Sequence, residues 1–230
     1  MGIRTWLVAA AALALPVAPS VPASGLVVAT CAGEPVTIFA GTPGDDLIVG
    51  TEEDDVIQGF EGNDTIYGLG GDDLICGGPG NDLLIGDGDG PGVPESASLA
   101  LLGVTTPSPG ADEIHGGAGH DNILGGPKGD LVLAGEHADS VWGGPGPDHL
   151  RGQAGFDLLR GGAADDELRG GRAADRLLAG PGDDVNRGNR GLDTLNGGDD
   201  IDVNRGGPGR DVCRQGEVNI GCGLLFPLPF

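Results

Sequence analysis

The order Gly-Gly-Pro-Gly-Asn-Asp-Leu-Leu-Ile at residues 77–85 recurs as Gly-Phe-Glu-Gly-Asn-Asp-Thr-Ile-Tyr at residues 59–67 and as Gly-Thr-Pro-Gly-Asp-Asp-Leu-Ile-Val at residues 41–49. The aspartate in the sixth place returns every nine residues over most of the chain, with one interruption. A period this short predicts a solenoid, in which each repeat is one turn and one short strand stacked on its neighbours. The seventeen repeat aspartates are Asp46, Asp55, Asp64, Asp73, Asp82, Asp112, Asp121, Asp130, Asp139, Asp148, Asp157, Asp166, Asp175, Asp184, Asp193, Asp202 and Asp211.

The first six places of the repeat have the composition of a turn, because glycine adopts positive φ and Asn or Asp tolerates it. The last three places form a short strand whose middle residue points inward. This residue is almost always aliphatic, which predicts a narrow aliphatic ladder as the core. Such a core needs no aromatics, in agreement with an aromatic content of 3%. The expected ladder members are Ile48, Ile57, Ile66, Ile75, Leu84, Ile114, Ile123, Val132, Val141, Leu150, Leu159, Leu168, Leu177 and Leu195.

Two residues in this inward row are polar, Asn186 and Asn204, and they lie two repeats apart. Two interpretations are open. The two amides could form a ladder inside the roll, or a local slip could turn Val185 and Val203 inward instead.

The formal net charge of -23 and the sequence pI near 4.1 make nucleic acid and anionic membrane surfaces poor partners and cations good ones. Glycine is abundant, at 48 residues, but it follows no three-residue period, which excludes collagen.

The nine-residue pattern closely resembles the hemolysin-type, or RTX, calcium-binding repeat, whose form is Gly-Gly-x-Gly-x-Asp-x-aliphatic-x. The resemblance covers residues 41–86 and 110–214 as a first and a second repeat block. It implies an all-β fold, a right-handed parallel β-roll (a β-solenoid) with two repeats per coil. It also implies several Ca²⁺ ions, held between glycine-rich turns by backbone carbonyls and repeat aspartates. Every second repeat would then share one edge of the roll.

Calcium suits such turns on physical grounds too, because it takes six to eight oxygen ligands in flexible geometry. Coils stack ~4.8 Å apart, so carboxylates in a row repel each other unless a divalent ion lies between them. The expected metal ligands are Asp46, Asp55, Asp64, Asp73, Asp82, Asp112, Asp121, Asp148, Asp157, Asp166 and Asp184.

The repeats are less regular after the interruption. Residues 41–86 always have Asp or Asn in the fifth place, whereas the second block keeps this only at Asp165 and Asp183. We expect the irregular turns to keep their shape and to bind calcium weakly or not at all. The fourth-place glycine is replaced at Glu53, Lys128, His137, Ala164, Ala173 and Asp200.

Basic residues concentrate near the C-terminus: residues 24–150 contain one, whereas residues 151–230 contain 10 basic and 13 acidic side chains. Guanidinium–carboxylate pairs could partly replace calcium in these coils, or the arginines could form an ordinary solvated face with little effect on stability. Six of them share the register three places after the repeat aspartate: Arg151, Arg160, Arg169, Arg187, Arg205 and Arg214.

Residues 87–109 interrupt the repeats and contain an apolar run from Leu99 to Val104. We expect a loop that leaves the roll, with an interaction site as the alternative. The spacing from Asp82 to Asp112 is not a multiple of the repeat period, so the sequence does not decide which strands pair across the gap.

Residues 1–24 are typical of an export signal, with Arg4 before an apolar stretch and Val21-Pro22-Ala23 as a cleavage site. Prolines end the apolar stretch too early for a membrane span. We therefore expect a secreted protein, extracellular or attached to the cell surface, with no membrane insertion after the signal is removed.

Four cysteines suit an oxidising compartment. Cys213 and Cys222 enclose eight residues directly after the last repeat, where a bridge would pin the open end of the stack. A cap or tail is expected at residues 215–230. Cys31 and Cys76 could tie a capping segment, residues 25–40, to the repeats. Three connectivities are possible, and the sequence does not choose among them.

No catalytic motif stands out, since the chain has neither a His-Glu-x-x-His helix nor a Gly-x-Ser-x-Gly elbow. His115, His120, His137 and His149 are expected at the surface, and we expect no enzymatic activity. The expected function is a secreted calcium-binding roll with a structural or cell-surface role, whose folding is coupled to calcium ligation. The alternatives are a non-catalytic adhesion or polysaccharide-binding module and an export module derived from an RTX enzyme.

Overall fold

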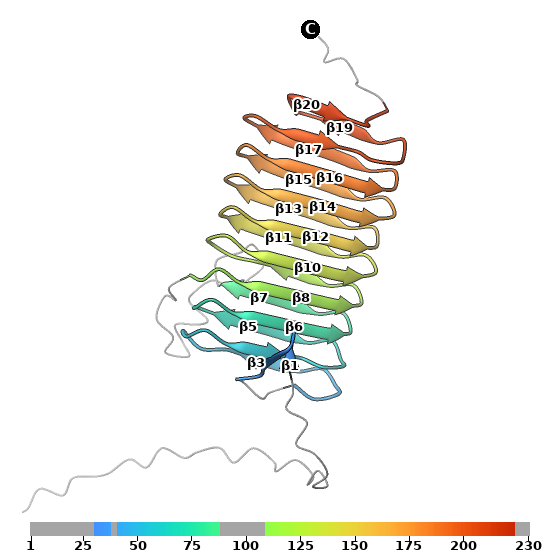
Figure 1. Ribbon diagram of the computed structural model, residues 1–230. Helices are drawn as coiled ribbons and strands as arrows, with labels where there is room; N and C mark the ends of the chain where they lie inside the picture. Colours follow the sequence, from blue (N-terminus) through green and yellow to red (C-terminus); the bar gives the residue numbers. More distant parts are fainter. Residues whose placement is uncertain (1–29, 38–40, 88–108, 224–230) are drawn as a thin grey trace, which may run out of the picture.

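The computed structural model describes residues 30–37, 41–87 and 109–223. These residues form an all-β solenoid of about eight turns, built from two parallel nine-stranded sheets that face each other (Figure 1). The expected parallel β-roll is therefore confirmed. The expected export signal, nearly all of the insertion and the end of the C-terminal tail lie outside the described residues. Within the described residues no helix has the length and hydropathy to cross a membrane.

Strands of the two sheets alternate along the chain, and a strand pairs in parallel with the strand one coil away. The even sheet consists of β4 (Val56–Gln58), β6 (Leu74–Pro79), β8 (Glu113–Ala118), β10 (Leu131–Glu136), β12 (His149–Ala154), β14 (Glu167–Arg172), β16 (Val185–Arg190), β18 (Val203–Arg205) and β20 (Val218–Ile220). The odd sheet consists of β3 (Leu47–Val49), β5 (Thr65–Leu69), β7 (Leu83–Asp87), β9 (Asn122–Leu124), β11 (Ser140–Pro145), β13 (Leu158–Ala163), β15 (Arg176–Pro181), β17 (Thr194–Asp199) and β19 (Val212–Arg214).

The core is the predicted aliphatic ladder. Every expected member from Ile48 to Leu195 is buried, and Cys213 extends the row. Asn186 and Asn204 continue it as an amide ladder, in which Asn186 Nδ2 donates to Asn204 Oδ1 at 2.9 Å. Asn204 Nδ2 donates in turn to Asn219 Oδ1 at 3.1 Å. The alternative slip does not occur.

The insertion interrupts one turn without disturbing the stack. β6 pairs with β8 and β7 pairs with β9, so the strands on either side of the insertion are neighbours in their sheets. Asp87 Oδ2 accepts the backbone N–H of Gly110 at 2.7 Å, across the insertion. This bond closes the base of the insertion and lets the coil continue.

Both ends of the described stack are tied by disulfides, one joining Cys31 to Cys76 and the other Cys213 to Cys222. The first holds the hairpin of β1 (Thr30–Cys31) and β2 (Glu34–Pro35) against the even sheet. Of the three connectivities left open by the sequence, the structure has this one.

Turns that lack the fourth-place glycine mostly keep the conformation of the others, as expected. Backbone φ stays positive at Lys128 (86°), His137 (83°), Ala164 (96°), Ala173 (78°) and Asp200 (80°). Left-handed backbone costs roughly 1–2 kcal/mol for a residue with a Cβ. These turns therefore keep their shape at the expense of stability.

Candidate metal centre

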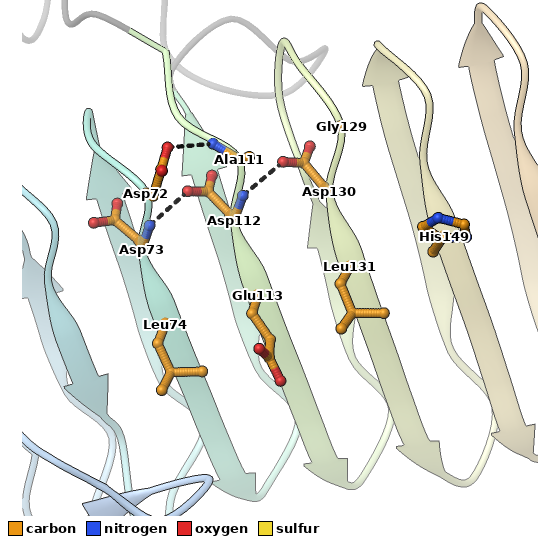
Figure 2. A pocket seen from close by; sticks show the side chains of 10 residues that line it. All are labelled: Asp72, Asp73, Leu74, Ala111, Asp112, Glu113, Gly129, Asp130, Leu131 and His149. Atoms are coloured by element: carbon orange, nitrogen blue, oxygen red, sulfur yellow. Dashed lines mark hydrogen bonds between the residues drawn. The ribbon is translucent and has the colours of Figure 1, made fainter.

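Each repeat aspartate from Asp64 onward lies at the start of a strand, where its carboxylate joins two coils. Its Oδ1 accepts the backbone N–H of the repeat aspartate one coil earlier, at 2.7–3.1 Å. Figure 2 shows three members of this row, in which Asp73 donates to Asp112 and Asp112 donates to Asp130. The result is an inner carboxylate ladder along each edge of the roll.

The second carboxylate oxygen of this ladder has no partner. In the described residues, Oδ2 is buried and forms no hydrogen bond in fifteen of the seventeen repeats. A buried polar atom without a partner is costly. These atoms are Oδ2 of Asp64, Asp73, Asp82, Asp112, Asp121, Asp130, Asp139, Asp148, Asp157, Asp166, Asp175, Asp184, Asp193, Asp202 and Asp211.

Oδ2 lies against the first-place glycine, at a position where a side chain on that residue would collide with it. A Cβ built on Gly77 would lie 2.3 Å from Asp82 Oδ2 and 2.8 Å from the carbonyl oxygen of Gly116, which is the first-place glycine of the next coil. The same pairing of a carboxylate with a carbonyl recurs at Gly59, Gly125 and other first-place glycines. Because these glycines have no side chain, a carboxylate oxygen and a carbonyl oxygen of the next coil come close together at the turn, and such hard oxygen atoms are the ligands that calcium prefers.

Side chains alone do not make a metal site here. Among the described residues, no three His, Cys, Asp or Glu side chains lie close enough together to hold an ion. Backbone carbonyls must therefore supply most of the ligands. That suits Ca²⁺, which accepts carbonyl oxygen, and does not suit Zn²⁺, which prefers nitrogen and sulfur.

Burial raises the pKa of these carboxyl groups. Desolvation raises the pKa of Asp148 to about 8, against the opposing effect of the hydrogen bond from the Asp130 N–H, and the charges of Asp130 and Asp166 raise it further. The same causes raise the pKa of Asp73 to about 8 and that of Asp82 to about 7. Two rows of buried acids thus need either protons or a cation.

Four repeats differ in the surroundings of Oδ2. Asp46 and Asp55 have Oδ2 satisfied internally, because it accepts the backbone N–H and the hydroxyl of Thr42 and of Thr51, respectively, at 2.6–2.9 Å. In the repeats of Asp139 and Asp184, Ala134 and Ala179 stand in the first place and are buried. These two repeats therefore carry a methyl group where the other repeats have none.

The fifth-place Asp and Asn side chains have a separate role that the sequence did not reveal. Asp54 Oδ1 accepts the backbone N–H of Asp72 in the next coil at 2.9 Å, and Asp72 Oδ1 accepts that of Ala111 at 2.9 Å. Asp165 does the same for Asp183. This exposed outer ladder joins the coils in the opposite direction from the inner one, so loss of the fifth-place acid removes a coil-to-coil bond.

All eleven expected metal ligands lie in turns at the two edges. The edge that leads into the odd sheet carries Asp46, Asp64, Asp82, Asp121 and Asp157, and the other carries Asp55, Asp73, Asp112, Asp148, Asp166 and Asp184. Six further aspartates that are not among the expected ligands have the same inner-ladder bond and unpaired Oδ2: Asp130, Asp139, Asp175, Asp193, Asp202 and Asp211.

Sequence reasoning also missed Glu217. Its Oε2 accepts the backbone N–H of Asp202 at 2.6 Å, in the place of a repeat aspartate. The signal was hidden because β20 follows its partner β18 at a shorter spacing than a full coil of two repeats.

A hollow of about 350 Å³ lies where the inner ladder meets the outer face of the even sheet (Figure 2). Asp72, Asp112 and Asp130 line it from the edge, and Glu113 and His149 line it from the strands. His149 and the exposed His120 and His137 do not gather with carboxylates into a metal cluster in the described part of the chain.

The RTX calcium-binding nonapeptide repeat model matches the chain at residues 40–75, 108–132, 115–150, 142–177 and 151–185. A comparison with curated proteins found no match. The matched residues include most of the coils with an unpaired inner carboxylate oxygen, and the calcium that such repeats bind is the ion for which the oxygen-lined turns are suited. The chain belongs to the family of RTX calcium-binding nonapeptide repeat proteins.

Proposed function

We propose that this protein is exported and folds outside the cell when Ca²⁺ binds between its stacked turns. The observation that supports this most directly is the double row of buried, unpaired aspartate oxygens. Calcium at the turns would supply the positive charge that these oxygens lack. Binding and folding would then be linked, because the unfolded chain has no preformed site.

Among the expected ligands, the best candidates combine an unpaired Oδ2 with a first-place glycine. These candidates are Asp64, Asp73, Asp82, Asp112, Asp121, Asp148, Asp157 and Asp166. Asp46, Asp55 and Asp184 are weaker, because threonine already satisfies the first two and a methyl group crowds the third.

Export is supported by the N-terminal sequence pattern and by the two disulfides, which suit an oxidising compartment. Extracellular calcium modules have dissociation constants of roughly 10⁻⁴–10⁻³ M. Such affinities would keep the acidic chain unfolded in the cytosol and fold it outside. A fusion of residues 1–24 to a reporter enzyme tests export directly, and retention of the reporter in the cytoplasm would overturn this part.

A non-catalytic structural or surface role agrees best with a molecule whose described residues are coils and their end caps. The family model that matches is a binding repeat, which supports the same role. The rod would present two flat faces and two calcium-bearing edges.

Calorimetric titration with calcium tests the site assignment. Asp148→Asn keeps the Oδ1 acceptor and replaces the unpaired Oδ2 with an amide nitrogen, which is no calcium ligand. We expect fewer bound ions and a higher calcium midpoint. Asp46→Asn is the matched control. It should change neither the number of bound ions nor the calcium midpoint, because Asp46 Oδ2 already accepts two hydrogen bonds from Thr42. Equal effects of the two variants would contradict the assignment.

A further inference from the structure

Four arginines form a straight row on the outer face of the even sheet. Arg151 on β12 is the register partner of Arg169 on β14, Arg169 is the partner of Arg187 on β16, and Arg187 is the partner of Arg205 on β18. Parallel strands are ~4.8 Å apart, so the row spans ~14 Å along the roll. We call these four residues the arginine row.

A second, shorter row runs beside it. Arg172 and Arg190 end β14 and β16 and are register partners. Gln153 and Asn189 have exposed amides and are both register partners of Gly171, which lies between the two rows on β14. The surface therefore combines six guanidinium groups with neutral hydrogen-bonding groups.

Little on the protein neutralises this surface. Glu167 accepts two hydrogen bonds from Arg169, at 2.6 and 3.0 Å, and one from Arg187. Within the described residues, Arg151, Arg172, Arg190 and Arg205 form no ion pair. Like charges on neighbouring strands are destabilising, so the row has a cost that a bound anion would remove.

The net charge of the chain conceals this positive surface. Residues 151–214 contain ten arginines and twelve acidic residues. Seven of those acids are repeat aspartates that are at most 3% exposed and belong to the inner ladder. Outside the inner ladder, residues 151–214 therefore contain five acidic residues and ten arginines.

We propose that the outer face of the even sheet, from β12 to β18, binds an extended acidic polysaccharide that lies along the arginine row. Guanidinium groups pair with carboxylate and sulfate in a bidentate manner, and the two amides suit sugar hydroxyls. The proposal goes beyond calcium ligation and uses the roll as its scaffold.

The chemistry favours a polysaccharide over single-stranded nucleic acid. Protein surfaces that hold single strands stack the bases on aromatic side chains. The outward positions of β12–β18 contain no Phe, Tyr or Trp. A regular, rigid row of charges instead fits a chain of regularly spaced anionic groups.

The test measures binding in saturating calcium and about 0.15 M salt. Heparin supplies sulfate groups, hyaluronan supplies carboxylate groups, and dextran is the neutral control. The variant Arg151→Gln, Arg187→Gln, Arg205→Gln should bind heparin and hyaluronan about tenfold to a hundredfold more weakly, because each exposed pair contributes a factor of about two to five.

The control variant is Arg160→Gln, Arg176→Gln, Arg214→Gln. It removes the same charge from the odd sheet, where these arginines have Trp142, Leu178, Leu158, Thr194 or Asn196 as register partners instead of arginine. It should bind like the unmodified protein. Unaltered calcium-dependent circular dichroism in both variants shows that the fold is kept and that calcium ligation is untouched.

A gain of binding gives an independent readout. Glu167→Gln removes the acid that pairs with Arg169 and Arg187 and should tighten heparin binding several-fold, whereas Glu113→Gln on β8 should not. Equal losses in the two triple variants would overturn the proposal, as would no binding to either acidic polysaccharide. Stronger binding to single-stranded DNA or to anionic vesicles than to heparin would overturn it too.

Discussion

Asp112 Oδ1 accepts the backbone N–H of Asp73 at 2.9 Å, although 39 residues separate the two in the sequence. Elsewhere in the inner ladder the same bond joins aspartates 18 residues apart, except from Asp82 to Asp121, which also crosses the insertion. The insertion thus enlarges one turn and leaves the register of both sheets intact. Asp87 and Pro109 stand at the two ends of these extra residues.

Deletion of residues 88–108 should leave the roll folded. It would join Asp87 to Pro109 and create the regular repeat Gly-Asp-Pro-Gly-Ala-Asp-Glu-Ile-His. Shortening a loop lowers the entropic cost of closing it only slowly, so we expect the same calcium midpoint and an equal or slightly higher thermal midpoint. A deletion variant that fails to fold in calcium would contradict the pairing of β7 with β9.

The calcium-free protein should become less stable as pH rises. Burial raises the pKa of the inner carboxyls from 3.8 to about 6 for Asp130, about 7 for Asp166 and about 8 for Asp148. The folded state then binds more protons than the unfolded state, so the stability from these groups is complete below pH ~4 and is lost as pH rises to ~8. Circular dichroism in chelator across this range checks the sign.

The result that contradicts this account is a calcium-free protein that gains stability between pH 5 and 8. Proton release on calcium binding provides a second check, because calcium should displace protons from the same carboxyls. Calorimetry in two buffers of different ionisation enthalpy measures that release.

The solenoid and its aliphatic ladder were predictable because the nine-residue period fixes both, whereas the two-repeat coil was predicted from the resemblance to the RTX repeat. Ile48 and Leu195 are buried for the same reason. The sequence did not decide how the strands of Asn186 and Asn204 pack. A short strand can bury either the two amides or, after a slip of one residue, Val185 and Val203. The sequence also could not show that Thr42 and Thr51 satisfy Asp46 and Asp55, because this depends on turn geometry.

The amide ladder should behave as a unit. Asn204→Leu removes the partner of Asn186 and of Asn219, and unsatisfied buried amides cost roughly 1–3 kcal/mol. We expect Asn186→Leu and Asn204→Leu together to cost less than the sum of the two single changes. Chemical unfolding of the three variants in calcium measures the coupling, and simple additivity would refute the ladder.

In some turns a residue with a Cβ has a left-handed backbone, and replacing that residue with glycine should stabilise the turn. Ala173 has φ of 78°, so Ala173→Gly should raise the free energy of unfolding by about 1 kcal/mol. Ala163→Gly is the control, because Ala163 does not have positive φ, and it should lower stability. Thermal unfolding in calcium compares the two, and a loss of stability in Ala173→Gly would contradict the turn geometry.

The central claim is that calcium drives this fold, and far-UV circular dichroism at pH 8 tests it most directly. The protein is first placed in chelator and then titrated with calcium, with magnesium as the parallel control. We predict a cooperative change from coil to β-structure with a midpoint between roughly 10⁻⁴ and 10⁻³ M calcium, and none with magnesium. A full β spectrum in chelator that calcium leaves unchanged would contradict the claim.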